Sequence, residues 1–206
     1  MIDYVVWCPG RCGSILTSRI LLAALYEQKL ELLHHTHKDT SYTGPAKIIH
    51  SHSPEFFINS KVACTKVALT RNIFDSAVSQ AIMLKTKIGN LVGQEQLDEY
   101  KNKFSDYKFI VDPAMFTHQV KKIDNEFTTV LRSNAEYVAI SYEQIKDNPF
   151  DVLKLLKINK KLINIKLLTE HVTSKKIPIE KSQMVTNFSE LKQIYDNLNL
   201  KNKSLT

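Results

Sequence analysis

The pattern that most restricts the fold lies near the N-terminal end of the chain. Residues 2–8 are apolar and rich in valine and aromatic side chains, which is typical of a buried strand. Residues 9–14 form a tight turn that contains Gly10 and Gly13, and residues 15–29 place apolar side chains at helical spacing. A strand that passes through a tight turn into a helix favours an α/β fold over an all-helical or all-strand one.

The same alternation continues along the chain. Further short apolar segments predict strands at 47–50, 62–70 and 136–141. Helices are expected at 75–87, 112–132, 148–156 and 189–198, with helix plus loop over 85–104. Asp112 followed by Pro113 is a typical helix start. With no repeat and no linker, residues 1–206 are expected to form a single three-layer α/β/α domain. Its central sheet would be mainly parallel, as in P-loop nucleotide-binding proteins.

Composition excludes several classes of protein. The 206 residues are 43 % hydrophobic and 24 % charged, which argues against disorder and fibrous folds. The longest apolar-rich stretch, residues 20–26, is shorter than the roughly 18 residues that a membrane helix needs. The start of the chain has no basic segment typical of a secretory signal. The three cysteines, Cys8, Cys12 and Cys64, give no disulfide framework, so we expect a cytoplasmic protein.

The charge favours anionic partners. The net charge is +7, from 28 Lys and Arg against 21 Asp and Glu. A basic protein attracts nucleotides, nucleic acids or acidic membranes, although a solvated lysine surface accounts for the total equally well. Only four of the basic residues are arginines: Arg11, Arg19, Arg71 and Arg132. Their positions are therefore more informative than the total.

The first turn has the features of an anion site. Backbone N–H groups at a helix N-terminus suit a phosphate or sulfate, and Gly10 and Gly13 permit close approach. Arg11 adds a cation and Ser14 adds a hydroxyl. The Gly-Lys-Ser/Thr sequence of P-loop nucleotide triphosphatases does not occur in this turn. The alternative is an ordinary turn whose glycines serve geometry alone.

The turn resembles the 5′-phosphosulfate loop of the sulfotransferases, which reads Pro, a short spacer, Lys or Arg, a small residue, Gly, and Ser or Thr. Residues 48–54 are similar to the family's Ile-Lys-Thr-His-Leu-Pro segment. His52 then takes the position of the family's catalytic base, and His50 takes the position of its lysine. The resemblance therefore implies a base at His52 and leaves the role of His50 open.

Two further segments follow in the family's order. Residues 67–79 are similar to the 3′-phosphate segment, where Arg71 and Ser79 take the two phosphate-contacting positions. Residues 140–149 resemble the Tyr-Glu-Asp-Leu-Lys-x-x-Pro segment, where Tyr142 takes the place of the tyrosine near the adenine. The Arg-Lys-Gly loop that closes over the 3′-phosphate has no counterpart here. Lys175, Lys176 and Lys181 are the basic residues in that region, and no role is assigned to them.

The resemblance implies a sulfotransferase that moves a sulfuryl group from 3′-phosphoadenosine 5′-phosphosulfate to a hydroxyl or amine acceptor by in-line displacement. His52 and Arg11 would be catalytic: a neutral imidazole takes the acceptor proton, and a fixed cation stabilises the leaving group. The residues implied in binding the nucleotide are Arg11, Cys12, Gly13, Ser14, Ile15, Arg71, Ser79 and Tyr142. The acceptor would be a small molecule or a carbohydrate, with a lipid, a phenol or a peptide also open, and nucleic acid is not expected.

No metal is expected for this reaction. Cys8 and Cys12 would need two further zinc ligands, and the intervals to His50 and His52 match no usual finger. His34, His35 and His37 form a second cluster, which we interpret as an exposed polar turn.

Two other classes of function stay open. A phosphotransferase or nucleotide hydrolase of the same fold would need Mg²⁺ and a Lys-Ser/Thr loop. A non-catalytic anion- or nucleic-acid-binding protein would show a steep salt dependence instead. Each of these assignments also has a purely structural alternative: His52 as a loop histidine, Arg71 as an arginine at a helix start, Ser79 as a surface serine of a helix and Tyr142 as a packed aromatic ring.

Overall fold

The computed structural model describes residues 2–27, 29–36, 45–60, 64–88, 93–145, 148, 150–159 and 179–202. Its centre is a five-stranded sheet of β1 (Tyr4–Trp7), β2 (Leu33–Thr36), β3 (Ile48–Ser51), β4 (Thr65–Thr70) and β5 (Val138–Ser141). The strands lie in the order β2-β3-β1-β4-β5, and every pair is parallel. The prediction of a parallel α/β sheet is therefore confirmed.

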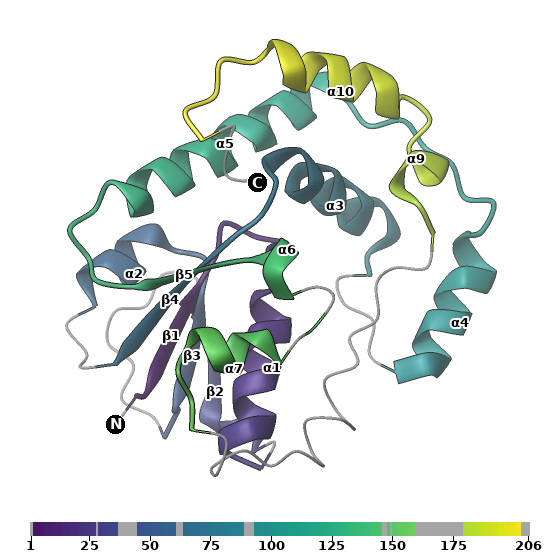
Figure 1. Cartoon of the computed structure of the whole chain (residues 1–206). Helices are drawn as coiled ribbons and strands as arrows, with labels where there is room; N and C mark the ends of the chain where they lie inside the picture. Colours follow the sequence, from purple (N-terminus) through teal and green to yellow (C-terminus); the bar gives the residue numbers. More distant parts are fainter. Residues whose placement is uncertain are drawn as a thin grey trace.

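Helices cover both faces of this sheet (Figure 1). On one side lie α1 (Ser14–Leu25), α6 (Tyr142–Ile145) and α7 (Asp151–Leu155). On the other lie α2 (Pro54–Asn59), α3 (Ile73–Thr86) and α5 (Pro113–Leu131), with α10 (Phe188–Asn197) packed outside α5. The remaining helices are a short 3₁₀ turn (Leu30–Leu32), α4 (Gly93–Phe104) and α9 (Lys181–Met184). The arrangement is the expected three-layer one.

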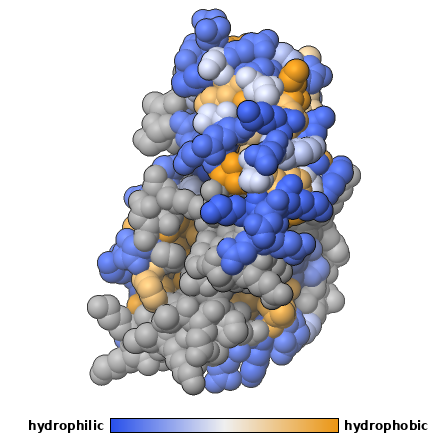
Figure 2. All heavy atoms as spheres, turned by 90° about the vertical axis from the view of Figure 1, so that its right-hand side faces the viewer, coloured by the Kyte–Doolittle hydropathy of each residue, from blue (hydrophilic) through white to orange (hydrophobic). Residues whose placement is uncertain are grey.

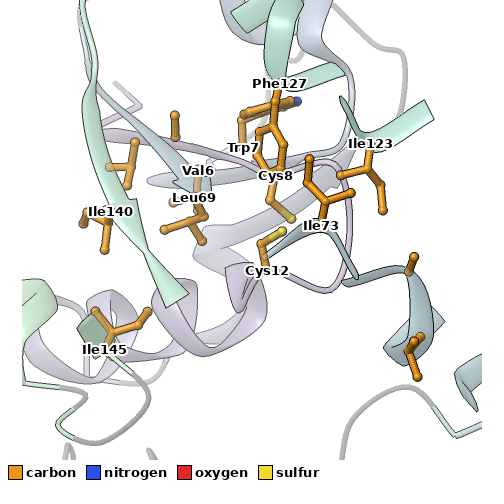
Figure 3. Close-up of a cluster of buried hydrophobic side chains, with 14 of the residues drawn as sticks. Val6, Trp7, Cys8, Cys12, Leu69, Ile73, Ile123, Phe127, Ile140 and Ile145 are labelled. Atoms are coloured by element: carbon orange, nitrogen blue, oxygen red, sulfur yellow. The ribbon is translucent and has the colours of Figure 1, made fainter. Parts of the chain in front are cut away.

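The central strand explains why the sheet must be covered on both faces. Val5, Val6 and Trp7 are all fully buried, although consecutive strand residues point to opposite faces. The Trp7 ring packs against Phe57 of α2 and edge-on against Phe127 of α5, with centroids 5.7 and 6.0 Å away. Figure 3 shows Phe127 beside Trp7 and Ile140 of β5 in the same core.

Aromatic rings also attach the C-terminal helices. Phe74 of α3 makes ring contacts with Phe116 of α5 and with Phe188 and Tyr195 of α10, at 5.2 to 5.7 Å. Further along α5, the buried Asp124 accepts hydrogen bonds from the backbone N–H groups of Lys201 and Asn202. The chain after α10 is thereby fixed to α5.

Several helix starts follow local chemistry. The Asp112 side chain accepts from the Ala114 N–H and Pro113 takes the first helical position, as expected. Asn72 caps α3 by accepting from the Asp75 N–H, so this helix begins at Ile73, two residues before the expected start. The helix expected to reach residue 29 ends at Leu25.

Two elements correct the sequence reading. Residues 33–36 are the edge strand β2, where we expected an exposed polar turn at His34 and His35. An edge strand tolerates polar side chains because one of its sides faces solvent. The apolar pattern by which a strand is recognised was therefore weak in residues 33–36. Residues 54–59 form the unpredicted helix α2, which Ser53 caps by accepting from the Phe56 N–H. Of the sequence segments discussed above, residues 28, 37, 62–63, 89–92, 146, 147, 149 and 175–176 lie outside the described residues.

The surface agrees with the lysine-rich composition. Figure 2 shows the face that includes the right-hand side of Figure 1, where hydrophilic residues predominate and hydrophobic ones emerge between them in separate areas. Within the part of the chain that the structure describes, no helix combines the length and apolar character required to cross a bilayer.

Candidate functional site

The predicted site residues gather because the strands are parallel. Carboxyl ends of parallel strands meet at one edge of a sheet, and α/β folds bind ligands there. The turn with Arg11 follows β1, His52 follows β3, Arg71 follows β4 and Tyr142 follows β5. Four segments far apart in the sequence are thus placed on one edge.

The turn after β1 has an unusual backbone. Gly10, Arg11 and Gly13 have φ angles of 112°, 57° and 86°. Left-handed residues in a turn are the kind of conformation that forms anion-binding concavities, and here the turn leads directly into α1. A side chain at Gly13 is also excluded by a neighbour, since a Cβ there would lie 2.7 Å from Cδ2 of Tyr142. The loop is therefore packed against α6.

Arg71 joins the turn to the tyrosine. Its Nη1 donates to the carbonyl oxygen of Arg11 at 2.7 Å, and its guanidinium lies over the Tyr142 ring, 4.2 Å from the centroid. The Nε atoms of Arg11 and Arg71 are both buried, and neither has a hydrogen-bond partner among the described residues. Burial and the nearby Arg71 charge lower the pKa of Arg11. Two adjacent cations with unused donors favour an anion between them.

Lys181 of α9 belongs to the same cationic group. Its Nζ lies 2.5 Å from Oδ1 of Asp75 and 3.0 Å from the Asp75 carbonyl oxygen, in the first turn of α3. Burial lowers the pKa of Lys181, and the charges of Arg71 and Arg11 lower it further, against the raising effect of Asp75. The sequence carried no signal for this residue because it lies in a lysine-rich region without a motif.

His52 lies next to the turn. Its Nδ1 is 2.8 Å from the carbonyl oxygen of Cys8 and 3.6 Å from the Cys8 sulfur. A carbonyl oxygen only accepts, so Nδ1 donates and Nε2 is the basic nitrogen of the neutral ring. Burial alone would lower the pKa of His52, but hydrogen bonds and charge from Cys8, with a smaller effect of Glu126, raise it.

His50 is buried and forms a bridge to the edge strand. Its Nδ1 is 2.7 Å from Nδ1 of His35, its register partner on β2. The His50 and His52 rings meet edge to face with centroids 4.6 Å apart. The position that resembles the family's lysine thus holds a buried imidazole between two other histidines.

The pKa values of the two nearby cysteines, Cys8 and Cys12, are shifted in opposite directions. Burial would raise the pKa of the Cys8 thiol, but the nearby side chains of Cys12, His50 and His52, and the charge of His52, lower it well below its usual value. The pKa of Cys12 is raised well above it by burial and by Cys8. The Cys12 thiol donates to the Gly10 carbonyl oxygen at 3.2 Å, so its side chain helps to fix the conformation of the turn. Figure 3 shows the side chains of Cys8 and Cys12 near each other within the buried cluster.

The other predicted residues take supporting positions. Ser14 begins α1 and accepts from the Cys8 thiol at 3.2 Å, and Ile15 follows it in the first turn. Ser79 is buried within α3, 6 % exposed. Its contact with a phosphate stays a prediction.

Glu126 is a further charged group that the sequence reasoning missed. Burial raises the pKa of this α5 carboxyl to about 7, against the lowering effect of Lys122, with Cys8, His52 and Glu55 acting on it as well. The signal was available, since Glu126 lies one helical turn from the buried Ile123 and next to Phe127, on the margin of the helix face that meets the core.

Comparisons with known proteins add little to this geometry. No family model matches the chain, and no curated protein matches it. Among solved structures, a crystal structure of a sulfotransferase from Alicyclobacillus acidocaldarius is 11 % identical to this chain, with a TM-score of 0.46. The match covers 95 % of this chain and 91 % of that one. A likeness at this level establishes neither a family nor an activity.

Proposed function

We propose that this protein transfers a sulfuryl group from 3′-phosphoadenosine 5′-phosphosulfate to a hydroxyl or amine of a small-molecule or carbohydrate acceptor. The observation that carries the proposal is the arginine pair beside the glycine turn. Arg11 and Arg71 are in contact, and each has a buried Nε without a partner among the described residues. A ligand with separate anionic groups would provide acceptors for both guanidinium ions.

Each group of the donor has a candidate partner. The 5′ end would meet Arg11 and the backbone N–H groups of residues 12–15 at the start of α1. The 3′-phosphate would meet Arg71 and Ser79, with Lys181 as a further cation near Arg71. Tyr142, which already supports the Arg71 guanidinium, would lie beside the adenine.

The chemistry of transfer requires a base and a stabilised leaving group. Nε2 of His52 would take the acceptor proton, while the bond from Nδ1 to the Cys8 carbonyl holds the ring in orientation. Negative charge that develops on the leaving bisphosphate would be stabilised by Arg11 and the N–H groups of the turn, which are fixed before reaction. In-line displacement depends mainly on such positioning.

The test is the affinity for adenosine 3′,5′-bisphosphate compared with that for AMP, measured by calorimetric titration. A charge-assisted contact to phosphate contributes roughly 1.5 to 3 kcal/mol, so the bisphosphate is expected to bind at least about tenfold more tightly. In the Arg71→Ala variant we expect this preference for the bisphosphate to shrink and the AMP affinity to change little. An unchanged AMP affinity also shows that the turn is intact.

Arg132→Ala is the matched control, because Arg132 ends α5 and takes no part in the arginine pair. Its two affinities should equal those of the parent protein. Equal affinity of the parent for both nucleotides would overturn the proposal. Mg²⁺-dependent turnover of ATP without bisphosphate preference would favour the phosphotransferase reading.

A further inference from the structure

We propose that Cys8, His50 and His52 form a binding site for a divalent cation of the zinc class, a ligand that the transfer reaction does not require. Each residue offers one ligand atom, and these atoms all lie within 4.8 Å of one another. The sequence intervals gave no zinc pattern, but β1 and β3 are neighbouring parallel strands that place the residues at their carboxyl ends together. Strand pairing thus brings together three possible ligands that the sequence intervals did not indicate.

The separations suit tetrahedral coordination. Zinc binds sulfur at about 2.3 Å and nitrogen at about 2.0–2.1 Å, which puts a sulfur and a nitrogen ligand roughly 3.5 Å apart. The Cys8 sulfur and Nδ1 of His52 are 3.6 Å apart, and Nδ1 would bind the cation after it gives up its proton and its hydrogen bond to the Cys8 carbonyl oxygen. Three protein ligands leave a fourth position for water or an anion. His52 is only half-buried, whereas Cys8 and His50 are buried.

His50 supplies the independent observation that points to a ligand. His50 is 4 % exposed, and its Nε2 is buried without a hydrogen-bond partner among the described residues. An imidazole nitrogen left in this state costs free energy, which a metal bond would remove. Its other nitrogen lies 2.7 Å from His35, and metal-bound histidines usually hydrogen-bond through their second nitrogen in this way.

The chemistry of Cys8 supports the same ligand class. The thiolate is the form of cysteine that binds metals, and the Cys8 sulfur lies within 4.8 Å of a ligand nitrogen of each histidine. Thiolate with imidazole favours zinc or cobalt over magnesium, which prefers oxygen ligands. Cys12 is left out of the set because its thiol donates to the Gly10 carbonyl.

The ligand set rests on geometry and is independent of the proposed function. If His52 is the base of the transfer reaction, a bound cation occupies it and the metal-loaded protein is inactive. The cation is then an inhibitor, and a chelator preserves or restores transfer.

Cobalt(II) titration of the metal-free protein, kept reduced with a phosphine, tests the site without an activity assay. We expect one equivalent to bind, with visible bands of tetrahedral intensity and a near-ultraviolet thiolate-to-cobalt charge-transfer band. Zinc displaces the cobalt and magnesium does not. Cys8→Ser loses the charge-transfer band, and His35→Ala weakens affinity by about 10- to 100-fold, as expected for a partner that orients a ligand.

Cys64→Ser and Cys12→Ser are the matched controls, and both should keep the band. Circular dichroism of each metal-free variant shows that it folds. If Cys8→Ser does not fold, His50→Gln carries the test and must weaken cobalt binding more than His35→Ala does. Absence of the band in the parent protein, its persistence in Cys8→Ser, or its loss in either control variant would overturn the proposal. The nucleotide titrations are read separately, so either proposal can fail alone.

Discussion

His52 uses its two ring nitrogens differently. Nδ1 donates to the backbone of Cys8, which comes from a different strand, and Nε2 is thereby the basic nitrogen. The hydrogen bond fixes the ring orientation, which matters more for a general base than a small change in acidity. His50, two residues earlier, points its Nδ1 toward the edge strand instead. The two histidines, two residues apart, thus make different contacts through Nδ1, one with the edge strand and one with the backbone of Cys8.

His52→Ala should abolish transfer and leave the affinity for adenosine 3′,5′-bisphosphate nearly unchanged, because a base acts on the acceptor and not on the nucleotide. Loss of general base catalysis costs on the order of 10² to 10⁴ in rate. Turnover on a panel of phenol and carbohydrate acceptors measures it. His118→Ala, an exposed histidine on α5, is the control and should retain full rate. Full turnover in His52→Ala would move the role to Glu55 or Glu126.

At the scale of elements, short helices position the site. α6 is a single turn after β5, yet its Tyr142 closes against the loop before α1 and supports Arg71 from β4. Three elements therefore determine the shape of the loop, and each depends on the others. The φ angle of Gly13 and the closeness of Tyr142 both require the absence of a side chain there.

Gly13→Ala should destabilise the protein by about 1–2 kcal/mol from the left-handed backbone, and by more because of the clash with Tyr142. In a Tyr142→Ala background the clash disappears, so the cost of Gly13→Ala falls. Chemical denaturation of the four proteins in a double-mutant cycle measures this coupling. Gly10→Ala is the control, since a Cβ at Gly10 would meet no atom within 4 Å and only backbone strain remains. Zero coupling between Gly13 and Tyr142 would show that the loop does not pack as described.

At the scale of the whole molecule, the sheet, α5 and the C-terminal helices share continuous contacts. Trp7 contacts α2 and α5, while α5 packs against α3 through Phe116 and Phe74 and also packs against α10. Asp124 ties the end of the described chain to the same helix. A single folding unit is the prediction that follows from this continuity.

Trp7 is the only tryptophan and reports on the core alone, whereas circular dichroism reports on all helices. For one cooperative domain the two unfolding transitions coincide. Adenosine 3′,5′-bisphosphate at a hundred times its Kd should stabilise both by about 2.7 kcal/mol. An earlier transition by circular dichroism than by fluorescence would mean that the outer helices unfold as a separate unit.

The sequence by itself determined the features that depend on neighbouring residues. Apolar runs defined β1, β3, β4 and β5, capping residues marked the start of α5, and the glycines marked the turn. Because the sheet is parallel, residues that follow strands share one edge, so Arg11, His52, Arg71 and Tyr142, which the resemblance singled out, lie at the same edge, and their roles stay predictions.

Only the tertiary structure decided the features that depend on distant segments. Strand order, the edge strand β2, the contact of His35 with His50, and the approach of Lys181 to the site have no local periodicity. Each is set by which elements pack together once the core closes. A polar side chain at an edge or on a short helix changes local propensity little, so its partner is chosen by packing and not by its sequence neighbours.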